Sequence, residues 1–251
     1  MNIQSVQRAT DIILLFCGAP RLGITEIATA LGLNKGTVWG LVTTLEQQGF
    51  LQQDQATHKY GLGSKLFELG MVYVGNLEIN ARAARPVQAL AGRTGLNARV
   101  GIWDNNSILI TFLAVPRSED YLSRQLGPRA PAYCSAIGKA LLAFFEPARL
   151  NSYLQTTELV RHTSATCTSR EQLRADLVAT RRRGFSITRG EMIPGLAALG
   201  APVFGRNREP VGAISVSETP AIVLGKRLGK FSEELIRTAA EISRELGHTI
   251  A

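Results

Sequence analysis

The chain has 251 residues, more than one typical domain of about 100 to 150 residues and fewer than three would need, so two domains are expected. Hydrophobic residues make up 45% and charged residues 19%, a globular balance that excludes extended disorder. No apolar run reaches about 18 residues, and Met1 to Asp11 lacks the pattern of a signal peptide. These features predict a cytoplasmic protein with no membrane contact.

The net charge of +8 is compatible with a nucleic-acid partner but does not locate its binding site. Residues 1–70 contain five basic and five acidic residues, so the whole surplus lies downstream. The run Arg181 to Arg183 favours a solvated helix face, with phosphate binding as the alternative. The cysteines lack metal or redox spacing and are expected to be free thiols: Cys17, Cys134 and Cys167.

Three helices are predicted in the first fifty residues. Apolar residues at helical spacing indicate the first helix over Ser5 to Cys17, with Ser5 as its N-cap. Thr25 is expected to cap a second, short helix that ends at Gly32 in a left-handed turn. Asn34 is expected to cap a third helix. Its apolar stripe repeats at i, i+3, i+4 and i+7: Val38, Leu41, Val42 and Leu45.

The pattern changes after the third helix. Phe50-Leu51 and Tyr60 to Leu62 flank a polar stretch, which predicts a two-stranded hairpin with a mobile tip. Helical spacing returns from Ser64, and a further helix is expected over about Glu78 to Thr94. These helices are candidates for a linker, so the predicted domains are residues 1–75 and 76–251.

The remaining residues mix strands and helices, which predicts an antiparallel sheet flanked by helices and an α+β fold class. The expected strands are residues 100–104, 108–115, 185–188, 201–204 and 211–216. The expected helices are residues 136–145, 170–184 and 229–247. Asn105-Asn106 is expected to form a hairpin turn between the first two strands.

Residues 24–45 meet the requirements of a helix-turn-helix. Ala28 is a small residue where the two helices approach each other, and Gly32 permits the turn. Val38 and Leu41 pack the second helix against the first. A generic helical hairpin with no DNA role is the alternative, and the following hairpin, which would serve as a wing, weakens it.

A second helix placed in the major groove would present its exposed N-terminal residues to DNA. Lys35 can neutralise a phosphate, while Thr37 and Trp39 lie on the face away from the packing residues. Most such residues are ordinary solvated side chains, but an exposed indole beside a basic residue is unusual on a monomer surface. The candidate DNA-binding residues are Ser5, Arg8, Thr25, Lys35, Gly36, Thr37, Trp39, Thr43, His58 and Lys59.

Seven runs of residues, in order along nearly the whole chain, carry a family resemblance. They are Ser5-Val-Gln-Arg-Ala9, Leu33-Asn-Lys-Gly-Thr-Val38, His58-Lys-Tyr-Gly-Leu-Gly63, Ser135-Ala-Ile-Gly-Lys-Ala-Leu-Leu-Ala143, Arg181-Arg-Arg-Gly-Phe185, Ala201-Pro-Val203 and Glu209-Pro-Val-Gly-Ala-Ile-Ser-Val-Ser217. With these runs the chain resembles the IclR family of bacterial transcription regulators. The resemblance implies a winged helix-turn-helix domain, a linker helix and a GAF-like α/β effector-binding domain. It also implies homodimers, often paired into homotetramers, on operator DNA, acting as repressor or activator.

One position of the third helix departs from the family pattern. Many relatives carry an arginine shortly after the threonine of this helix, where this sequence has Gly40. An arginine that reads guanine with two hydrogen bonds contributes about 1 to 3 kcal/mol of discrimination. Its absence predicts modest affinity per half-site and dependence on avidity, with Trp39 packing against a thymine methyl as a substitute.

The strand expected near the C-terminus has two different faces. Ile214 and Val216 point to one side, while Ser215 and Ser217 point to the other. Periodicity alone favours solvent exposure of the serine face. The resemblance implies instead that both serines lie at the bottom of an effector pocket and bind a carboxylate. The pocket residues that it implies are Ser135, Ala136, Ile137, Thr188, Leu196, Ala198, Ser215 and Ser217.

Two pocket positions depart from relatives that bind glyoxylate and pyruvate. Those relatives have aspartate in place of Thr188 and cysteine in place of Ala198. The predicted pocket is therefore more apolar and less crowded, which favours an aromatic or longer-chain acid over a two-carbon acid. Cys134 is either a pocket residue or, as favoured, a small buried hydrophobe. Three aromatic residues line the cavity or, as favoured, fill the core: Trp103, Phe112 and Tyr133.

Patterns for catalysis do not survive inspection. Lys139 lacks the glycine spacing and following hydroxyl of a phosphate-binding loop, and Gly61-Leu-Gly63 lacks the third glycine of a dinucleotide motif. The three histidines are too dispersed for a metal set. We therefore expect no catalytic residue, no metal and no cofactor. Two alternatives are an enzyme fused to a DNA-binding domain and a ligand-binding protein that has lost DNA binding.

Overall fold

The computed structural model describes residues 2–116 and 127–249, and it divides into two compact units, residues 1–76 and 77–251. The predicted boundary between residues 75 and 76 lies one residue before this division. Each unit has its own hydrophobic core.

The first unit contains four helices and a two-stranded antiparallel sheet. These elements are α1 (Gln4–Leu15), α2 (Ile24–Leu31), α3 (Lys35–Gln47), β1 (Leu51–Gln53), β2 (Tyr60–Leu62) and α4 (Ser64–Gly75). Ile12, Ile27, Val38 and Val42 are fully buried between α1, α2 and α3, as the helical spacing predicts. Leu51 and Tyr60 of the hairpin close this core, and their burial fixes the hairpin against the helices.

Two predicted helix caps are wrong. Helix α1 begins at Gln4 after Ile3, so Ser5 lies inside its first turn and does not cap it. Helix α2 begins at Ile24 after Gly23, whose extended backbone enters the helix while its N–H donates to the Glu26 carboxylate at 2.6 Å. The Glu26 carboxylate, in the third position of the helix, is therefore the side chain that binds a free backbone N–H at the start of α2. The Thr25 hydroxyl was expected in that role.

The second unit is a six-stranded antiparallel sheet in the order β5-β4-β3-β8-β7-β6, with helices on both faces. Its strands are β3 (Asn97–Asp104), β4 (Ser107–Ala114), β5 (Arg129–Pro131), β6 (Ser186–Arg189), β7 (Ala197–Phe204) and β8 (Pro210–Glu218). Its helices are α5 (Glu78–Thr94), η1 (Ala132–Cys134), α7 (Ala136–Leu142), α8 (Pro147–Thr156), α9 (Arg170–Arg183), α10 (Pro220–Val223) and α11 (Leu228–Glu245).

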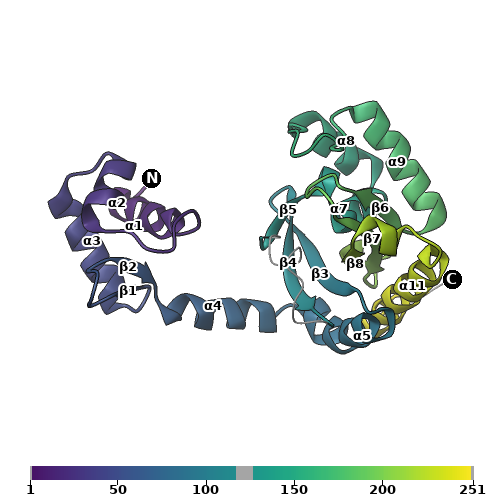
Figure 1. Ribbon diagram of the computed structural model, residues 1–251, viewed down its shortest axis with the longest axis horizontal. Helices are drawn as coiled ribbons and strands as arrows, with labels where there is room; N and C mark the ends of the chain where they lie inside the picture. Colours follow the sequence, from purple (N-terminus) through teal and green to yellow (C-terminus); the bar gives the residue numbers. More distant parts are fainter. Residues whose placement is uncertain (1, 117–126, 250–251) are drawn as a thin grey trace. The chain divides into compact units, whose positions relative to one another are not determined.

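Two separate apolar clusters hold helices to the sheet. Helices α5 and α11 cover one face through residues such as Val87, Leu90 and Phe231. Helices α7, α8 and α9 form the layer over the other face, with Ile137, Leu141 and Leu173 among their buried residues (Figure 1). Because both faces of the sheet are covered, the expectation from periodicity that the serine face of β8 is exposed is wrong.

The full length of β7 and the presence of α8 were not predicted from the sequence. Strand β7 starts at Ala197, four residues before the predicted strand, because three of its first four residues are alanine or glycine, which have low strand propensity. Helix α8 was missed, although Pro147 at its first position and the spacing of Leu150, Tyr153 and Leu154 are typical of a helix. Asn105 and Asn106 both have positive φ, as a tight hairpin turn requires.

Candidate functional site

The turn between α2 and α3 sets the direction of α3. Gly32 has φ +64°, a left-handed conformation in which a residue with a side chain is strained. The Asn34 side chain then accepts a hydrogen bond from the Thr37 N–H at 2.8 Å and caps α3, as predicted. Because Val38 and Val42 are fully buried, the opposite side of α3 faces solvent.

Helix α3 carries five of the ten predicted DNA-binding residues: Lys35, Gly36, Thr37, Trp39 and Thr43. Lys35, Gly36 and Trp39 are exposed, and the Trp39 side chain is 61% accessible although it is large and apolar. Thr37 and Thr43 are half-buried, while the exposed Thr44 hydroxyl donates to the Gly40 carbonyl within the helix. The geometry therefore presents a basic and an aromatic side chain at the N-terminal end of α3.

The hairpin tip is ordered by local hydrogen bonds. Asp54 accepts from the N–H groups of Ala56 and Thr57 at 3.0 and 2.9 Å, and His58 has a positive φ. The Lys59 ammonium pairs with Glu26 of α2 at 2.8 Å. The bond from Lys59, with the backbone bond from Gly23, lowers the pKa of Glu26. A phosphate at Lys59 would share the ammonium with this carboxylate.

The other predicted residues of this surface lie on α1 and α2. Ser5 is exposed and Arg8 is half-buried on α1, and Thr25 is exposed in the first turn of α2. Sequence reasoning did not single out Glu26, which joins the start of α2 to the hairpin. Its position three residues after Gly23 is the signal that could have identified it.

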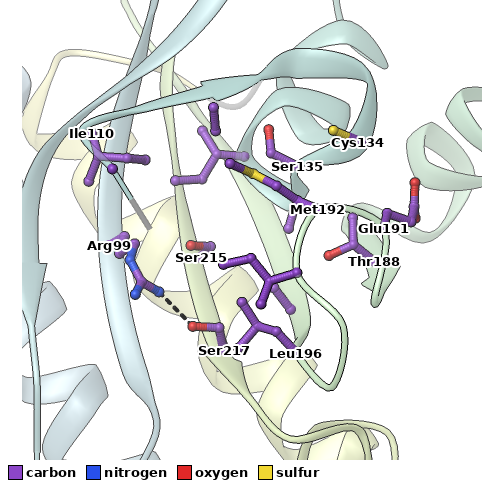
Figure 2. Close-up of a pocket in the computed structure, with 16 residues that line it drawn as sticks. Arg99, Ile110, Cys134, Ser135, Thr188, Glu191, Met192, Leu196, Ser215 and Ser217 are labelled. Carbon is purple, nitrogen blue, oxygen red and sulfur yellow. Dashed lines mark hydrogen bonds between the residues drawn. The ribbon is translucent and has the colours of Figure 1, made fainter. Parts of the chain in front are cut away.

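The second unit contains a cavity between β8 and the start of α7, and all eight predicted effector residues line it. The cavity itself has a volume of about 60 Å³, and the space between the lining side chains reaches about 570 Å³ when the solvent at its mouth is included. Ser215 and Ser217 of β8 are both buried and form one side of it (Figure 2). Leu196 and Met192, from the loop between β6 and β7, lie opposite them.

Arg99 is the cavity residue that sequence reasoning missed. It lies on β3 beside Ser215 of β8, is only 4% exposed, and donates from Nη1 to the Ser217 hydroxyl at 2.6 Å (Figure 2). Arg99 adds a guanidinium to an otherwise mainly apolar wall. The sequence contains a signal for this residue, because a charged side chain inside a run of small and apolar residues of a central strand is unusual.

The serine at the start of α7 has a structural role in the cavity wall. The Ser135 hydroxyl accepts from the Gly138 N–H at 3.2 Å and caps α7. Ala136 and Ile137 follow it, so the cap holds the first turn of α7 against the cavity. Thr188 and Ala198 are partners across β6 and β7, and both line the cavity.

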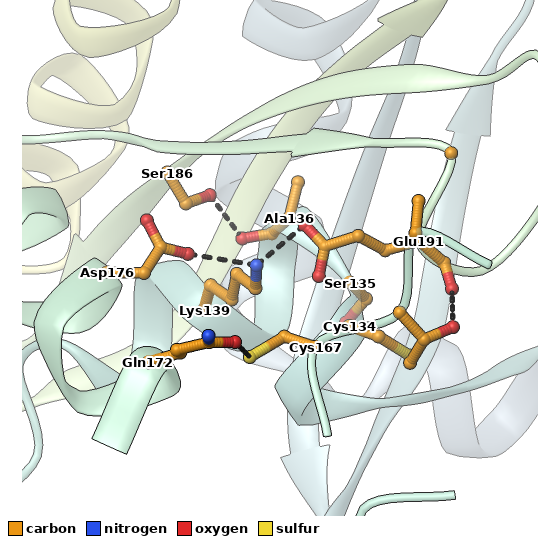
Figure 3. Close-up of polar contacts among 12 residues, drawn as sticks. Cys134, Ser135, Ala136, Lys139, Cys167, Gln172, Asp176, Ser186 and Glu191 are labelled. Atoms are coloured by element: carbon orange, nitrogen blue, oxygen red, sulfur yellow. Dashed lines mark hydrogen bonds and ion pairs between the residues drawn. The ribbon is translucent and has the colours of Figure 1, made fainter. Parts of the chain in front are cut away.

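A buried ion cluster lies behind this wall. The Lys139 ammonium, which is buried, pairs with Glu191 at 2.7 Å and Asp176 at 2.9 Å (Figure 3). Burial opposes the charge of Lys139, but the two carboxylates raise its pKa above the ordinary value. Lys139 therefore stays protonated at neutral pH and joins the cavity loop that carries Glu191 to α9.

The predicted aromatic residues belong to the apolar cores, whereas Cys134 lines the cavity. Trp103, Phe112 and Tyr133 pack in or against the two apolar cores and do not line the cavity, so core filling was the correct interpretation. Cys134 is both buried and a cavity residue, and burial, with the nearby charge of Glu191, raises its pKa to about 12. All three cysteines are free.

A winged helix-turn-helix unit joined to an α/β unit with a cavity that has polar groups at one side defines the class of ligand-responsive transcriptional regulators. The family model described as IclR helix-turn-helix domain matches residues 5–55, and the model described as bacterial transcriptional regulator IclR C-terminal matches residues 71–244. The chain belongs to the IclR family of bacterial transcriptional regulators.

Known proteins agree with this assignment over almost the full chain. The HTH-type transcriptional regulator XynR of Escherichia coli is 33% identical over 247 residues, covering 98% of each chain. The crystal structure of the Thermotoga maritima IclR is 25% identical with a TM-score of 0.83, covering 98% of this chain and 100% of that one.

A Microbacterium hydrocarbonoxydans IclR homolog, solved with 4-hydroxybenzoate, shares the fold at 19% identity with a TM-score of 0.82. It covers 97% of this chain and 99% of that one. Among the described residues, no helix is both long and apolar enough to cross a membrane.

Proposed function

We propose that an organic carboxylic acid, aromatic or longer-chain, binds in the cavity of the second unit and controls operator binding by α3 and the wing. The observation that carries this proposal is the placement of Arg99 beside the hydroxyls of Ser215 and Ser217 at one side of a mainly apolar cavity. Charge-assisted hydrogen bonds from a guanidinium to a carboxylate are about twice as strong as neutral ones.

The apolar part of the cavity wall supports this ligand class. A two-carbon acid would leave most of the apolar lining around Leu196 and Met192 without contact. An aromatic acid can place its carboxylate at the Arg99 side and its ring against that lining. The Microbacterium homolog, which shares this fold, is solved with 4-hydroxybenzoate, so that compound is a suitable first probe.

Calorimetry with three small molecules tests the effector proposal. We expect 4-hydroxybenzoate to bind at least about tenfold more tightly than 4-hydroxybenzamide, since the amide lacks the charge that the guanidinium recognises. Glyoxylate should also bind more weakly. Ser217→Ala should reduce binding of the acid and leave binding of the amide less affected. Equal affinity for the acid and the amide, or tighter binding of glyoxylate, would show that the proposal is wrong.

The DNA-binding surface proposed here consists of the exposed residues of α3, the wing and the adjacent residues of α1 and α2. A gel-shift assay with the intergenic DNA upstream of the gene tests it and distinguishes a regulator from a ligand-binding protein that has lost DNA binding. Trp39→Ala should weaken binding, because its exposed indole lies beside Lys35 at the N-terminal end of α3. Gln47→Ala, at the far end of the same helix, is the matched control. Unchanged affinity of Trp39→Ala would remove Trp39 from the contact surface.

The proposed regulator is a homodimer or homotetramer that associates through α4 and has no catalytic role. Helix α4 contains no buried residue, although it carries five large apolar side chains that are mostly exposed: Phe67, Leu69, Met71, Val72 and Tyr73. Such a concentration of exposed large apolar side chains on one helix is typical of an interaction site. A second copy of the same helix supplies the matching surface.

A further inference from the structure

The second unit has another hollow, which shares no residue with the effector cavity. It is a groove of about 900 Å³, including solvent at its mouth, where the end of α9 meets α11 and β7. Its floor is apolar: Phe144, Ala201, Pro202, Phe204, Ile236 and Ala239. None of the described residues that line the groove is acidic. Its rim carries four arginines: Arg181, Arg182, Arg183 and Arg244.

The charge of the rim exceeds what the local structure neutralises. Arg181 to Arg183 lie in the last turn of α9 and Arg244 in the last turn of α11. Each helix end carries about half a negative charge, so the two ends together offset about one of the four positive charges. Asp176 pairs with Arg183 at 3.5 Å but also with Lys139 at 2.9 Å, so it offsets only part of a second charge. At least about two positive charges are left for a ligand.

The arginines are positioned by their own contacts. Arg183 donates to the Phe185 carbonyl and to the Thr180 hydroxyl, and Arg181 lies over the Phe144 ring at 5.5 Å. Arg244 donates from Nε to the Ala240 carbonyl. A guanidinium has five N–H donors, so these contacts position the side chains and leave further donors available. Arg182, which is exposed, adds a fourth cation.

The floor between these charges is aromatic. Phe204 contacts Phe144 edge to face at 5.3 Å and stacks with the His248 ring at 5.2 Å. Such an arrangement accepts the face or edge of a further ring. The groove therefore combines a cationic rim with an apolar floor in the size range of small-molecule sites.

We infer that this groove is a second ligand site, which binds a phosphate monoester that carries an aromatic or similarly apolar group. A phosphate monoester has a charge of about −1.5 to −2 at pH 7, close to the excess positive charge of the rim. Its three oxygens suit the fork geometry of arginine. The ester group contacts the floor of phenylalanine, alanine and proline side chains.

Fluorescence titration of the full chain with 1-naphthyl phosphate tests the inference. The Arg182→Ala and Arg244→Ala variants should each weaken binding by about tenfold or more, because each removes charge-assisted hydrogen bonds. Raising the salt concentration should also weaken the binding of 1-naphthyl phosphate, since the arginines of the rim are exposed. Arg174→Ala is the matched control, because Arg174 is an exposed arginine on the same helix that does not line the groove.

Three outcomes would overturn the inference. The first is no saturable binding of 1-naphthyl phosphate by the wild-type chain. The second is equal affinity of the Arg182→Ala, Arg244→Ala and Arg174→Ala variants. The third is a loss of binding in Ser217→Ala with none in the groove variants, which would place the probe in the effector cavity. Both arginines are solvent-exposed, so their substitution should leave the thermal unfolding temperature unchanged.

Discussion

Gly40 occupies a position on α3 where an added side chain meets open space. A Cβ built there has no neighbour within 4 Å, and the residue is exposed inside a regular helix. The absence of an arginine at this position, noted against the family pattern, is therefore not enforced by packing. It leaves the surface of α3 with less positive charge than the helix could carry.

We predict that Gly40→Arg increases affinity for duplex DNA and makes binding more sensitive to salt. One added phosphate contact should steepen the dependence of log affinity on log salt by about 0.9. Gly40→Ala is the control, because it supplies the gain in helix propensity, about 1 kcal/mol, without the charge. Fluorescence anisotropy at several salt concentrations measures both variants. The prediction fails if Gly40→Arg binds DNA no more tightly than Gly40→Ala.

Cys134 is a second residue whose surroundings decide its chemistry. Its burial raises the pKa of the thiol to about 12, so at pH 8 almost none of it is thiolate, the reactive form. We predict that iodoacetamide modifies the exposed Cys17 well before Cys134 in the native chain. Mass spectrometry of peptides sampled during the reaction gives both rates. Modification of both thiols at equal rates would contradict the closed environment of Cys134.

At the scale of elements, the contact between α7 and the segment before it shapes the effector cavity. A Cβ at Gly138 would lie 2.3 Å from the backbone of Ala132, so η1 and α7 approach each other more closely than a side chain permits. The same turn carries the cap from Ser135 and the cavity residues Ala136 and Ile137. The glycine in this run is therefore required by packing.

We predict that Gly138→Ala lowers the free energy of unfolding of the second unit by about 2 kcal/mol or more, as overpacking of a rigid backbone contact does. Gly92→Ala is the matched control, since Gly92 lies on α5 with no atom near its added Cβ, and it should stabilise by about 0.5 to 1 kcal/mol. Denaturant unfolding followed by Trp103 fluorescence, in a Trp39→Phe background, reports this unit alone. A Gly138→Ala variant as stable as the parent chain would show that the contact can relax.

At the scale of the whole molecule, α4 carries five exposed large apolar side chains and no buried residue. Phe67 is 71% exposed, and Met71, one turn further along, is 56% exposed. The DNA-binding unit is nearly neutral over residues 1–70, so it gains little from long-range attraction to phosphates. Avidity from paired units would compensate, which connects the proposed α4 interface to DNA affinity.

We predict that Phe67→Glu/Met71→Glu converts the assembly to monomers and lowers operator affinity by about 100-fold or more, because two linked half-sites no longer bind together. Sedimentation velocity measures the assembly, and circular dichroism checks that the helices persist. Glu68→Gln, on the same helix, removes only an exposed ion pair with Lys65 and should change neither property. A wild-type chain that sediments as a monomer at micromolar concentration would refute the proposed interface.

Local sequence spacing was enough to predict the helix-turn-helix. Gly32, the Asn34 cap and the buried stripe of α3 act over only a few residues, so their pattern is visible in the chain itself. Most helices and strands of the second unit were predicted for the same reason. The errors at Ser5 and Thr25 arose because several neighbouring residues can cap a helix, and only the path of the backbone selects one.

The sites depend on residues that are distant in the sequence, and here tertiary structure decided. The alternation along β8 predicted that Ser215 and Ser217 share a face, but only the helices packed over that face made it the wall of a cavity. Arg99 joins Ser217 across 118 positions because β3 and β8 are neighbours in the sheet. Likewise, the arginines at the ends of α9 and α11 line one groove because the fold brings both helix ends and β7 together. Periodicity determines which face a side chain occupies, whereas strand order and helix packing determine what it meets there.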